Sequence, residues 1–359
     1  MKILDSYLVK KYLSTVLFVM LLVIMISVAI DVSDKVQSFI SKPCTTKEIL
    51  FTYYPGFIMH MIGLLMPIFT LIGVVFFTSR LAFNAEILSI LNAGVSFNRL
   101  LRPYMIAAVV VSTGHLLINH FIAPAFNKSR LWFERKYVWL DQDKGKTSNV
   151  HILVAPDMKA YIRGYNKNGN TVSGLRIEHF RGNQILSILD AETAVFKSDP
   201  NRWELSNYTI RNFNGFQETF TRYTAPLDTA INLLPDDFVY YTNQNEEMTT
   251  PELYEAIERN RERGAFNKSY EIETHRRTAD AATNIILTVI GLAVAGRKVR
   301  GGMGLHIAIA VGIGALFVLL SKFASSFASS NVISVGLGIW IPNMAFIAVA
   351  FLVSSKAQK

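Results

Sequence analysis

The side chains in this sequence that could do covalent or metal chemistry are few and widely separated. Its single cysteine, Cys44, cannot form an internal disulfide or a cysteine metal cluster. His115 and His120 stand five apart in an apolar run, so on a helix they face different sides and suit helix packing better than metal binding. The nucleotide-binding loop GxxxxGKS/T and the GxSxG, HExxH and CxxC motifs do not occur. We therefore expect no enzyme activity, no cofactor and no metal site.

One carboxylate stands out because it lies among basic residues. Glu86 is the only acidic residue of the segment 76–104, in which Arg80 and two further arginines carry the remaining charge. The residues around it favour a helix that ends at Gly94, which predicts a short helix at the membrane surface over about 83–94. Two interpretations are open. Glu86 is either a solvated charge on an interfacial helix or the anchor of a coupling helix that docks onto a soluble ATPase.

Six long apolar segments must position these residues. Hydrophobic residues make up 51% of the 359-residue chain and the mean hydropathy is +0.29, both outside the usual soluble range. A helix of about 20 apolar residues crosses a bilayer core, and the segments of that length are 12–31, 56–78, 103–123, 279–296, 303–323 and 332–354. The first is too long for a signal peptide and no A-x-A site follows it. The spans hold almost no ionisable residue besides histidine, so energy for transport would come from another subunit.

Basic residues give these spans a direction. They gather at the N-terminus, between spans two and three, between spans four and five and at the C-terminus, which all fall on one side. They are Lys2, Lys10, Lys11, Arg80, Arg99, Arg102, Arg297, Lys298, Arg300, Lys356 and Lys359. By the positive-inside rule, both termini are cytoplasmic and the chain is a multi-pass inner-membrane protein. The basic residues form no tract with interleaved aromatic residues, so we expect no nucleic-acid partner.

The segment between spans three and four is rich in predicted strands separated by turns. The strands are expected at 150–155, 158–165, 172–180, 184–196, 203–213 and 216–223, a spacing typical of a sandwich, a jelly roll or an open barrel. Helical connectors follow at about 249–263 and 269–277. The predicted fold is an α-helical membrane protein with an inserted all-β domain. Spans one to three lie in 1–123, the β domain outside the cytoplasm with its connectors in 124–278, and spans four to six in 279–359.

Three sequence blocks occur in a characteristic order. They are AEILSILNAGVS (85–96), EIETHRR (271–277) with RGGMGL (300–305) after the next apolar helix, and WIPN (340–343) at the start of the last span. With the plan of three spans, a β domain and three spans, they resemble the LptF/LptG (YjgP/YjgQ) family of lipopolysaccharide export permeases over essentially the whole chain. The sequence around Glu86 resembles LptG slightly more than LptF. The chain departs from the family pattern at 278–281, which lacks a common proline, and at Asp31, where many members have a basic residue.

The resemblance implies the permease subunit of an ABC-type exporter, and it implies that the β domain in 124–278 is periplasmic and jelly-roll-like. Such a permease extracts lipopolysaccharide from the inner membrane and passes it to a periplasmic β-jelly-roll bridge. The implied partners are an LptB-like cytoplasmic ATPase dimer, which hydrolyses ATP, a second permease of the same family, and LptC- and LptA-like bridge proteins. Two other functions stay open. A permease for another lipid or lipoprotein would differ in substrate binding, and a membrane-anchored periplasmic scaffold or receptor would not associate with an ATPase.

The resemblance also implies roles for particular residues. The residues expected to couple to the ATPase are Glu86, Ile87, Leu88, Leu91 and Arg80. Glu86 would be the charged anchor in the ATPase groove, and the apolar residues would pack there. Lys35, Lys42 and Lys322 lie near the outer ends of spans one and five and are candidate contacts for lipid A phosphates. Lysines at span ends also commonly extend to lipid headgroups without binding a specific ligand.

Overall fold

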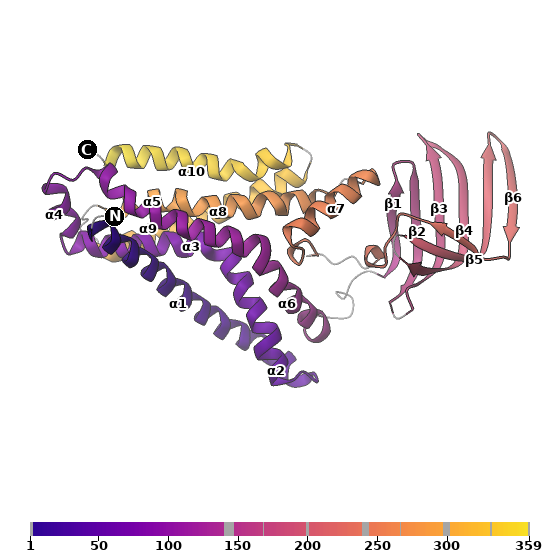
Figure 1. Ribbon diagram of the computed structural model, residues 1–359, viewed down its shortest axis with the longest axis horizontal. Helices are drawn as coiled ribbons and strands as arrows, with labels where there is room; N and C mark the ends of the chain where they lie inside the picture. Colours follow the sequence, from indigo (N-terminus) through magenta and orange to yellow (C-terminus); the bar gives the residue numbers. More distant parts are fainter. Residues whose placement is uncertain are drawn as a thin grey trace. The chain divides into compact units, whose positions relative to one another are not determined.

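The computed structural model describes residues 3–139, 147–167, 169–198, 201–238, 244–265, 267–296, 302–330 and 332–357. The chain forms two compact units (Figure 1). The helical unit comprises Met1–Val138, Asn245–Leu253 and Lys268–Lys359, and the β unit comprises Trp139–Gln244 and Tyr254–Asn267. Five basic residues that support the predicted orientation lie outside the described residues: Lys2, Arg297, Lys298, Arg300 and Lys359.

The described residues contain six helical segments that are long and apolar enough to cross a membrane. Their helices are α1 (Ile3–Ser41), α2 (Thr46–Glu48), η1 (Ile49–Tyr53), α3 (Tyr54–Phe83), α5 (Phe97–Leu117), η2 (Ile118–Ile122), α6 (Ala123–Tyr137), α8 (Lys268–Ala295), α9 (Gly302–Ser329) and α10 (Val335–Ala357). The second segment runs through α2, η1 and α3, and the third through α5, η2 and α6. The short helix α4 (Glu86–Asn92) connects these two segments. The predicted plan of three and three spans is confirmed.

The first helix is longer than predicted. The predicted span ends at residue 31, whereas α1 continues to Ser41. Asp31 and Lys35 lie one turn apart on it and form an ion pair of 2.8 Å. The charged residues that suggested a loop therefore stabilise a further length of helix.

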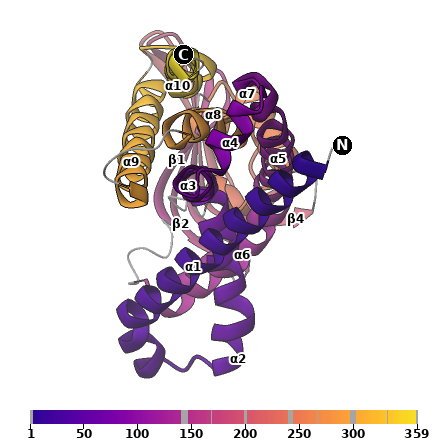
Figure 2. The ribbon, with the colours of Figure 1, turned by 90° about the vertical axis from the view of Figure 1, so that its left-hand side faces the viewer.

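Helices α3 and α8 form the centre of the helical unit, and α1 and α9 lie outside them (Figure 2). In their most apolar stretches, 61% of the residues of the second segment and 67% of those of α8 are buried, against 17% for α1 and 22% for α9. The buried His115 connects the central helices. Its Nε2 lies 2.9 Å from the Gly63 carbonyl oxygen, and its Nδ1 lies 2.9 Å from the amide nitrogen of Asn284. Polar groups inside a membrane need such partners, so His115 joins α5 to α3 and α8 in keeping with the helix-packing role expected of it.

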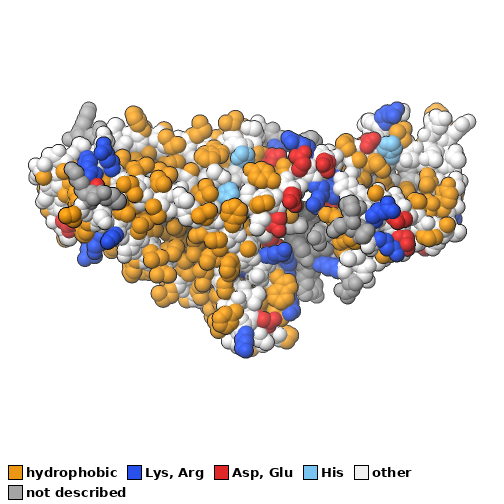
Figure 3. Space-filling view, in the orientation of Figure 1, with side chains coloured by type: hydrophobic (Ala, Val, Ile, Leu, Met, Phe, Trp, Pro, Cys, Tyr) orange, Lys and Arg blue, Asp and Glu red, His pale blue; other side chains and the backbone are white. Residues whose placement is uncertain are grey.

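The outer surface of the helical unit is apolar. Hydrophobic side chains cover it on the face shown in Figure 3; lysines and arginines with few acidic neighbours lie at the end that holds both termini and α4, and basic and acidic side chains lie together at the other end. Exposed apolar residues of α1 and α9 include Leu21, Met25, Leu319 and Phe323. A continuous apolar surface of this kind marks a contact with membrane or protein partners rather than with water.

The β unit contains one antiparallel sheet of seven strands within the described residues. They are β1 (Ser148–Ala155), β2 (Met158–Asn166), β3 (Thr171–Arg181), β4 (Gln184–Ser198), β5 (Arg202–Asn214), β6 (Gln217–Tyr223) and β7 (Leu227–Ala230). Strands β1 to β6 neighbour one another in sequence order, and β7 pairs with the first part of β5. The six predicted strands are confirmed. Their order, which the sequence did not determine, is a meander.

The core of the β unit forms around Trp203, which is 1% exposed. Its indole Nε1 donates a hydrogen bond of 3.0 Å to the Leu233 carbonyl oxygen, so the polar atom of the buried ring has a partner. After the sheet come the short helices η4 (Pro235–Phe238) and η5 (Gln244–Glu246) and then α7 (Thr250–Glu262). The backbone N–H of Thr249 donates to the Glu252 carboxylate at 2.6 Å, one half of a capping box at the start of α7. Both predicted helical connectors are present, as α7 and as the first turns of α8.

Candidate functional site

The short helix α4 is fixed at both of its ends. Ala85 precedes it with a φ of 61°, which turns the chain away from α3. Glu86 occupies the first turn, where the helix dipole favours a carboxylate, and accepts a hydrogen bond of 3.3 Å from Asn84 Nδ2. Beyond the helix, the Ser96 hydroxyl accepts a hydrogen bond of 3.3 Å from the Arg99 backbone N–H and caps α5. Local hydrogen bonds thus hold α4 between the two long helices.

The inner and outer faces of α4 differ in burial. Ile87 is 2% exposed and packs in a cluster that includes Leu81 and Leu100 of the neighbouring helices. Leu88 and Leu91, three residues apart, are 56% and 37% exposed and share the outer face. Of the apolar residues expected to couple to the ATPase, Ile87 is thus buried within this chain, whereas Leu88 and Leu91 are exposed. The role of Ile87 is to fix α4 to the helical unit.

The surroundings of α4 complete a small mixed surface. Glu86 is half-buried and Arg80, on the last turn of α3, is exposed. The Arg80 carbonyl oxygen accepts the Asn84 N–H at 3.0 Å and so ends α3 where the connection begins. One carboxylate, one arginine and two exposed leucines are the kind of polar and apolar mixture found at protein–protein interfaces.

The candidate substrate contact Lys35 does not present a free charge. Its Nζ lies 2.8 Å from an Asp31 oxygen and 2.9 Å from a Glu134 oxygen, and it also contacts the Tyr53 hydroxyl. Arg130 lies one turn before Glu134 on α6 and reaches it at 3.4 Å. The expectation that Lys35 binds a substrate phosphate therefore has no support from its surroundings, because neighbouring carboxylates neutralise it in a partly buried site.

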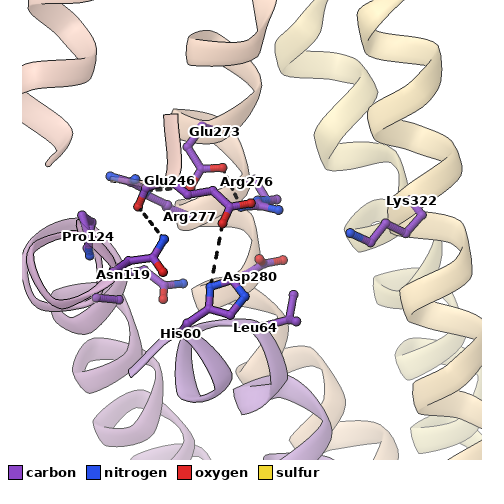
Figure 4. A pocket seen from close by; sticks show the side chains of 13 residues that line it. His60, Leu64, Asn119, Pro124, Glu246, Glu273, Arg276, Arg277, Asp280 and Lys322 are labelled. Atoms are coloured by element: carbon purple, nitrogen blue, oxygen red, sulfur yellow. Dashed lines mark hydrogen bonds and ion pairs between the residues drawn. The ribbon is translucent and has the colours of Figure 1, made fainter. Parts of the chain in front are cut away.

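The candidate Lys322 lines a charged pocket of about 140 Å³ in the helical unit (Figure 4). Its exposed side chain extends from α9 toward Asp280 of α8. On another wall, His60 Nδ1 lies 3.9 Å from the Glu246 carboxylate, and Glu273 pairs with two arginines of its own helix. These side chains can bind a charged or polar headgroup, and Lys322 is the cation on the α9 side.

The structure does not bring the three candidate lysines together. Lys42 is half-exposed in the turn between α1 and α2, and neither it nor Lys35 lines the pocket of Lys322. The other residues of the pocket come from α3, η2, α6, α8 and the segment before α7, so only the tertiary fold shows their proximity.

A second cavity, of about 310 Å³, lies within the β unit. Its mainly apolar lining includes Ile177, Leu189, Leu205, Ile210 and Leu227. None of the site residues expected from the sequence lines this cavity, although alternation along the strands predicts that such side chains share one face of the sheet. The cavity can hold an apolar chain away from water.

The comparison with known families covers nearly the whole chain. The family model described as lipopolysaccharide export system permease LptF/LptG matches residues 6–356. It represents LptF and LptG alike, so the slight LptG-like leaning stays a prediction. No curated protein matches this sequence. The chain belongs to the lipopolysaccharide export system permease LptF/LptG family.

Proposed function

We propose that this chain is one of two permease subunits of an ABC-type exporter that extracts lipopolysaccharide, with a separate cytoplasmic ATPase dimer supplying the energy. One observation supports this proposal beyond the family match. In α4, Ile87 is buried while Leu88 and Leu91 remain exposed beside Glu86. A seven-residue helix that is fixed from inside and apolar on its outer face can pass the movement of a bound partner to α3 and α5.

The proposed orientation places α4 and both termini in the cytoplasm and residues 124–278 in the periplasm. The lysines and arginines around the termini and α4 support it through the positive-inside rule. Spans in 1–123 and 279–359, together with a second permease of the same family, enclose the path of the lipid. An LptC- and LptA-like periplasmic bridge receives the lipid from the β unit.

The apolar cavity suits the acyl chains of an anionic lipid, and the charged pocket suits its phosphate. Each acyl CH₂ moved from the bilayer into water costs about 0.8 kcal/mol, so a lipid with several chains needs an apolar binding site when it leaves the bilayer. The apolar cavity of the β unit offers one. Lys322, exposed at the charged pocket, provides a cation for a phosphate, and Lys42 is a second candidate.

The docking of an ATPase on α4 is tested by isolating the tagged chain from its native membrane in mild detergent. We expect a soluble ATPase and a second six-span permease with the unchanged chain. Glu86→Arg should lose the ATPase, because it reverses the anchoring charge, and should keep the second permease. The matched control is Glu258→Arg, the same change at an exposed glutamate of α7, which should keep both.

Two results would contradict the proposal. If the unchanged chain is isolated without an ATPase, the scaffold interpretation is favoured. If the ATPase remains bound to Glu86→Arg, docking occurs elsewhere on the chain.

A further inference from the structure

The segment Asn245–Leu253, here called the strap, connects the two units in an unusual way. The chain leaves the β unit after Gln244, belongs to the helical unit along the strap and enters the β unit again at Tyr254. The end of the strap is the first turn of α7, whose later turns belong to the β unit. The strap and the β unit therefore share one continuous helix.

One buried arginine of α8 holds the strap. Arg277 is 3% exposed, and its Nη2 donates to the carbonyl oxygens of Met248 at 2.8 Å and Asn245 at 3.2 Å. Its Nη1 donates to the Thr250 hydroxyl at 3.3 Å, and its Nε donates to the Glu273 carboxylate at 2.9 Å. The planar guanidinium is the side chain that can make several such bonds in fixed directions, and bonds from a charged donor are stronger than neutral ones.

The strap is also held from the third helical segment. The Asn127 amide of α6 donates to the Glu246 carbonyl oxygen at 3.2 Å, and Arg135 Nη1 donates to the Glu247 carboxylate at 3.2 Å. At the end of the strap, the Thr250 hydroxyl lies 2.8 Å from His120 Nδ1. Contacts from two different spans leave the strap little freedom to move independently of them.

A series of ion pairs connects the strap to α1. Lys35 of α1 lies 2.9 Å from Glu134, which Arg130 approaches at 3.4 Å. Arg130 also lies 3.9 Å from the Glu246 carboxylate of the strap, and His60 faces the same carboxylate at 3.9 Å. These pairs explain why Lys35 is occupied within the chain. They connect the position of the first span to the strap.

We propose that Arg277 is a positioning residue that clamps the strap to the fourth span, beside the contacts that hold it to the third, so that movement of these spans is passed along α7 to the β unit. The clamp itself is a property of this chain alone. The statement that it transmits the movement of a transport cycle rests on the proposed function.

The clamp is tested on the full chain in detergent by hydrogen–deuterium exchange of peptides from the strap. The test variant is Arg277→Lys, which keeps the positive charge beside Glu273 but replaces the planar donor group with one ammonium. We expect exchange of the strap to rise at least tenfold, equivalent to about 1.4 kcal/mol, while peptides from the buried part of α8 keep their protection. The control is Arg276→Lys, because the neighbouring Arg276 pairs with the same Glu273 at 2.6 Å and should leave the strap unchanged. Equal exchange in the unchanged chain and Arg277→Lys, or equal increases in both variants, would overturn the proposal.

A second measurement separates positioning from general stability. In the complex with the ATPase, Arg277→Lys should keep the ATPase bound, because α4 is unaltered, while lipopolysaccharide released per ATP hydrolysed falls at least tenfold. Unchanged release from a chain whose strap exchanges faster would overturn the transmitting role. Failure of the proposed function would appear differently, as absence of the ATPase from the unchanged chain, and the exchange result would still decide the clamp.

Discussion

Removal of the buried anchor of α4 is the perturbation whose effect follows most directly from the structure. Ile87→Ala deletes a side chain that is 2% exposed in the cluster between α4 and its neighbours. The helix has seven residues, and isolated helices of fewer than about 12 residues are unstable in water. The packing of Ile87 is therefore the main reason that α4 stays folded and in place.

The size of the effect can be estimated. Truncation of a buried isoleucine to alanine costs about 2–5 kcal/mol. At about 1.4 kcal/mol for each tenfold change, a loss of about 3 kcal/mol increases the detached population of α4 on the order of 100-fold. Leu88→Ala is the matched control, because Leu88 is 56% exposed and exposed substitutions change stability by about 0.5 kcal/mol or less.

Hydrogen–deuterium exchange of peptides that cover α4 measures this population, since exchange reports local opening. Ile87→Ala should raise exchange on the order of 100-fold, and Leu88→Ala should leave it close to that of the unchanged chain. ATPase binding should weaken in both variants, through loss of helix order in the first and loss of contact in the second. Unchanged exchange in Ile87→Ala, or a comparable rise in Leu88→Ala, would refute the assignment of inner and outer faces.

Three further predictions concern stability. Lys35→Met removes the cation shared by Asp31 and Glu134; Glu134 keeps Arg130, but the buried Asp31 carboxylate loses its ion-pair partner. The expected cost is about 3–5 kcal/mol, so this variant should lower the Tm in detergent, whereas Lys42→Met should leave the Tm unchanged; equal Tm values would contradict the internal role of Lys35. Gly56→Ala places a Cβ 2.6 Å from the backbone and side chains of α6, whereas Gly114→Ala meets nothing within 4 Å. Only Gly56→Ala should lower the Tm, because the overpacked Cβ costs about 1–3 kcal/mol of unfolding free energy. Trp203→Ala should destabilise the β unit by about 3–5 kcal/mol, seen as faster limited proteolysis of the sheet in the full chain.

Most of the fold could be predicted because its signals are local. The spans are continuous apolar runs, and the strands alternate between turns, so β1 to β6 match the predicted segments closely. The strand β7 (Leu227–Ala230) was missed because four residues directly after Pro226 carry little periodic signal, and pairing with β5 is what orders them. The extension of α1 to Ser41 was missed because its charged residues resembled those of a loop.

The candidate site residues could be predicted only where they lie close together in sequence on one helix. The pattern around Glu86 places α4 and its exposed leucines, but the burial of Ile87 depends on how α4 packs on α3 and α5. Asp31 lies one turn from Lys35 on the same helix, but the second carboxylate partner, Glu134, lies 99 positions later in the sequence. The arginine that holds the strap lies within the block 271–277, which the family resemblance identified, but its contacts with the strap appear only in the folded chain.

The most direct test of the central claim is reconstituted transport. The chain is placed in lipopolysaccharide-containing proteoliposomes with its co-isolated permease and ATPase, and lipopolysaccharide transferred to a soluble bridge protein is measured. We expect transfer that requires ATP and falls at least tenfold in Ile177→Arg, which puts a charge into the apolar cavity of the β unit. Lipopolysaccharide that stays in the membrane despite a complete complex and ATP, or transfer that proceeds equally well without ATP, would contradict the account.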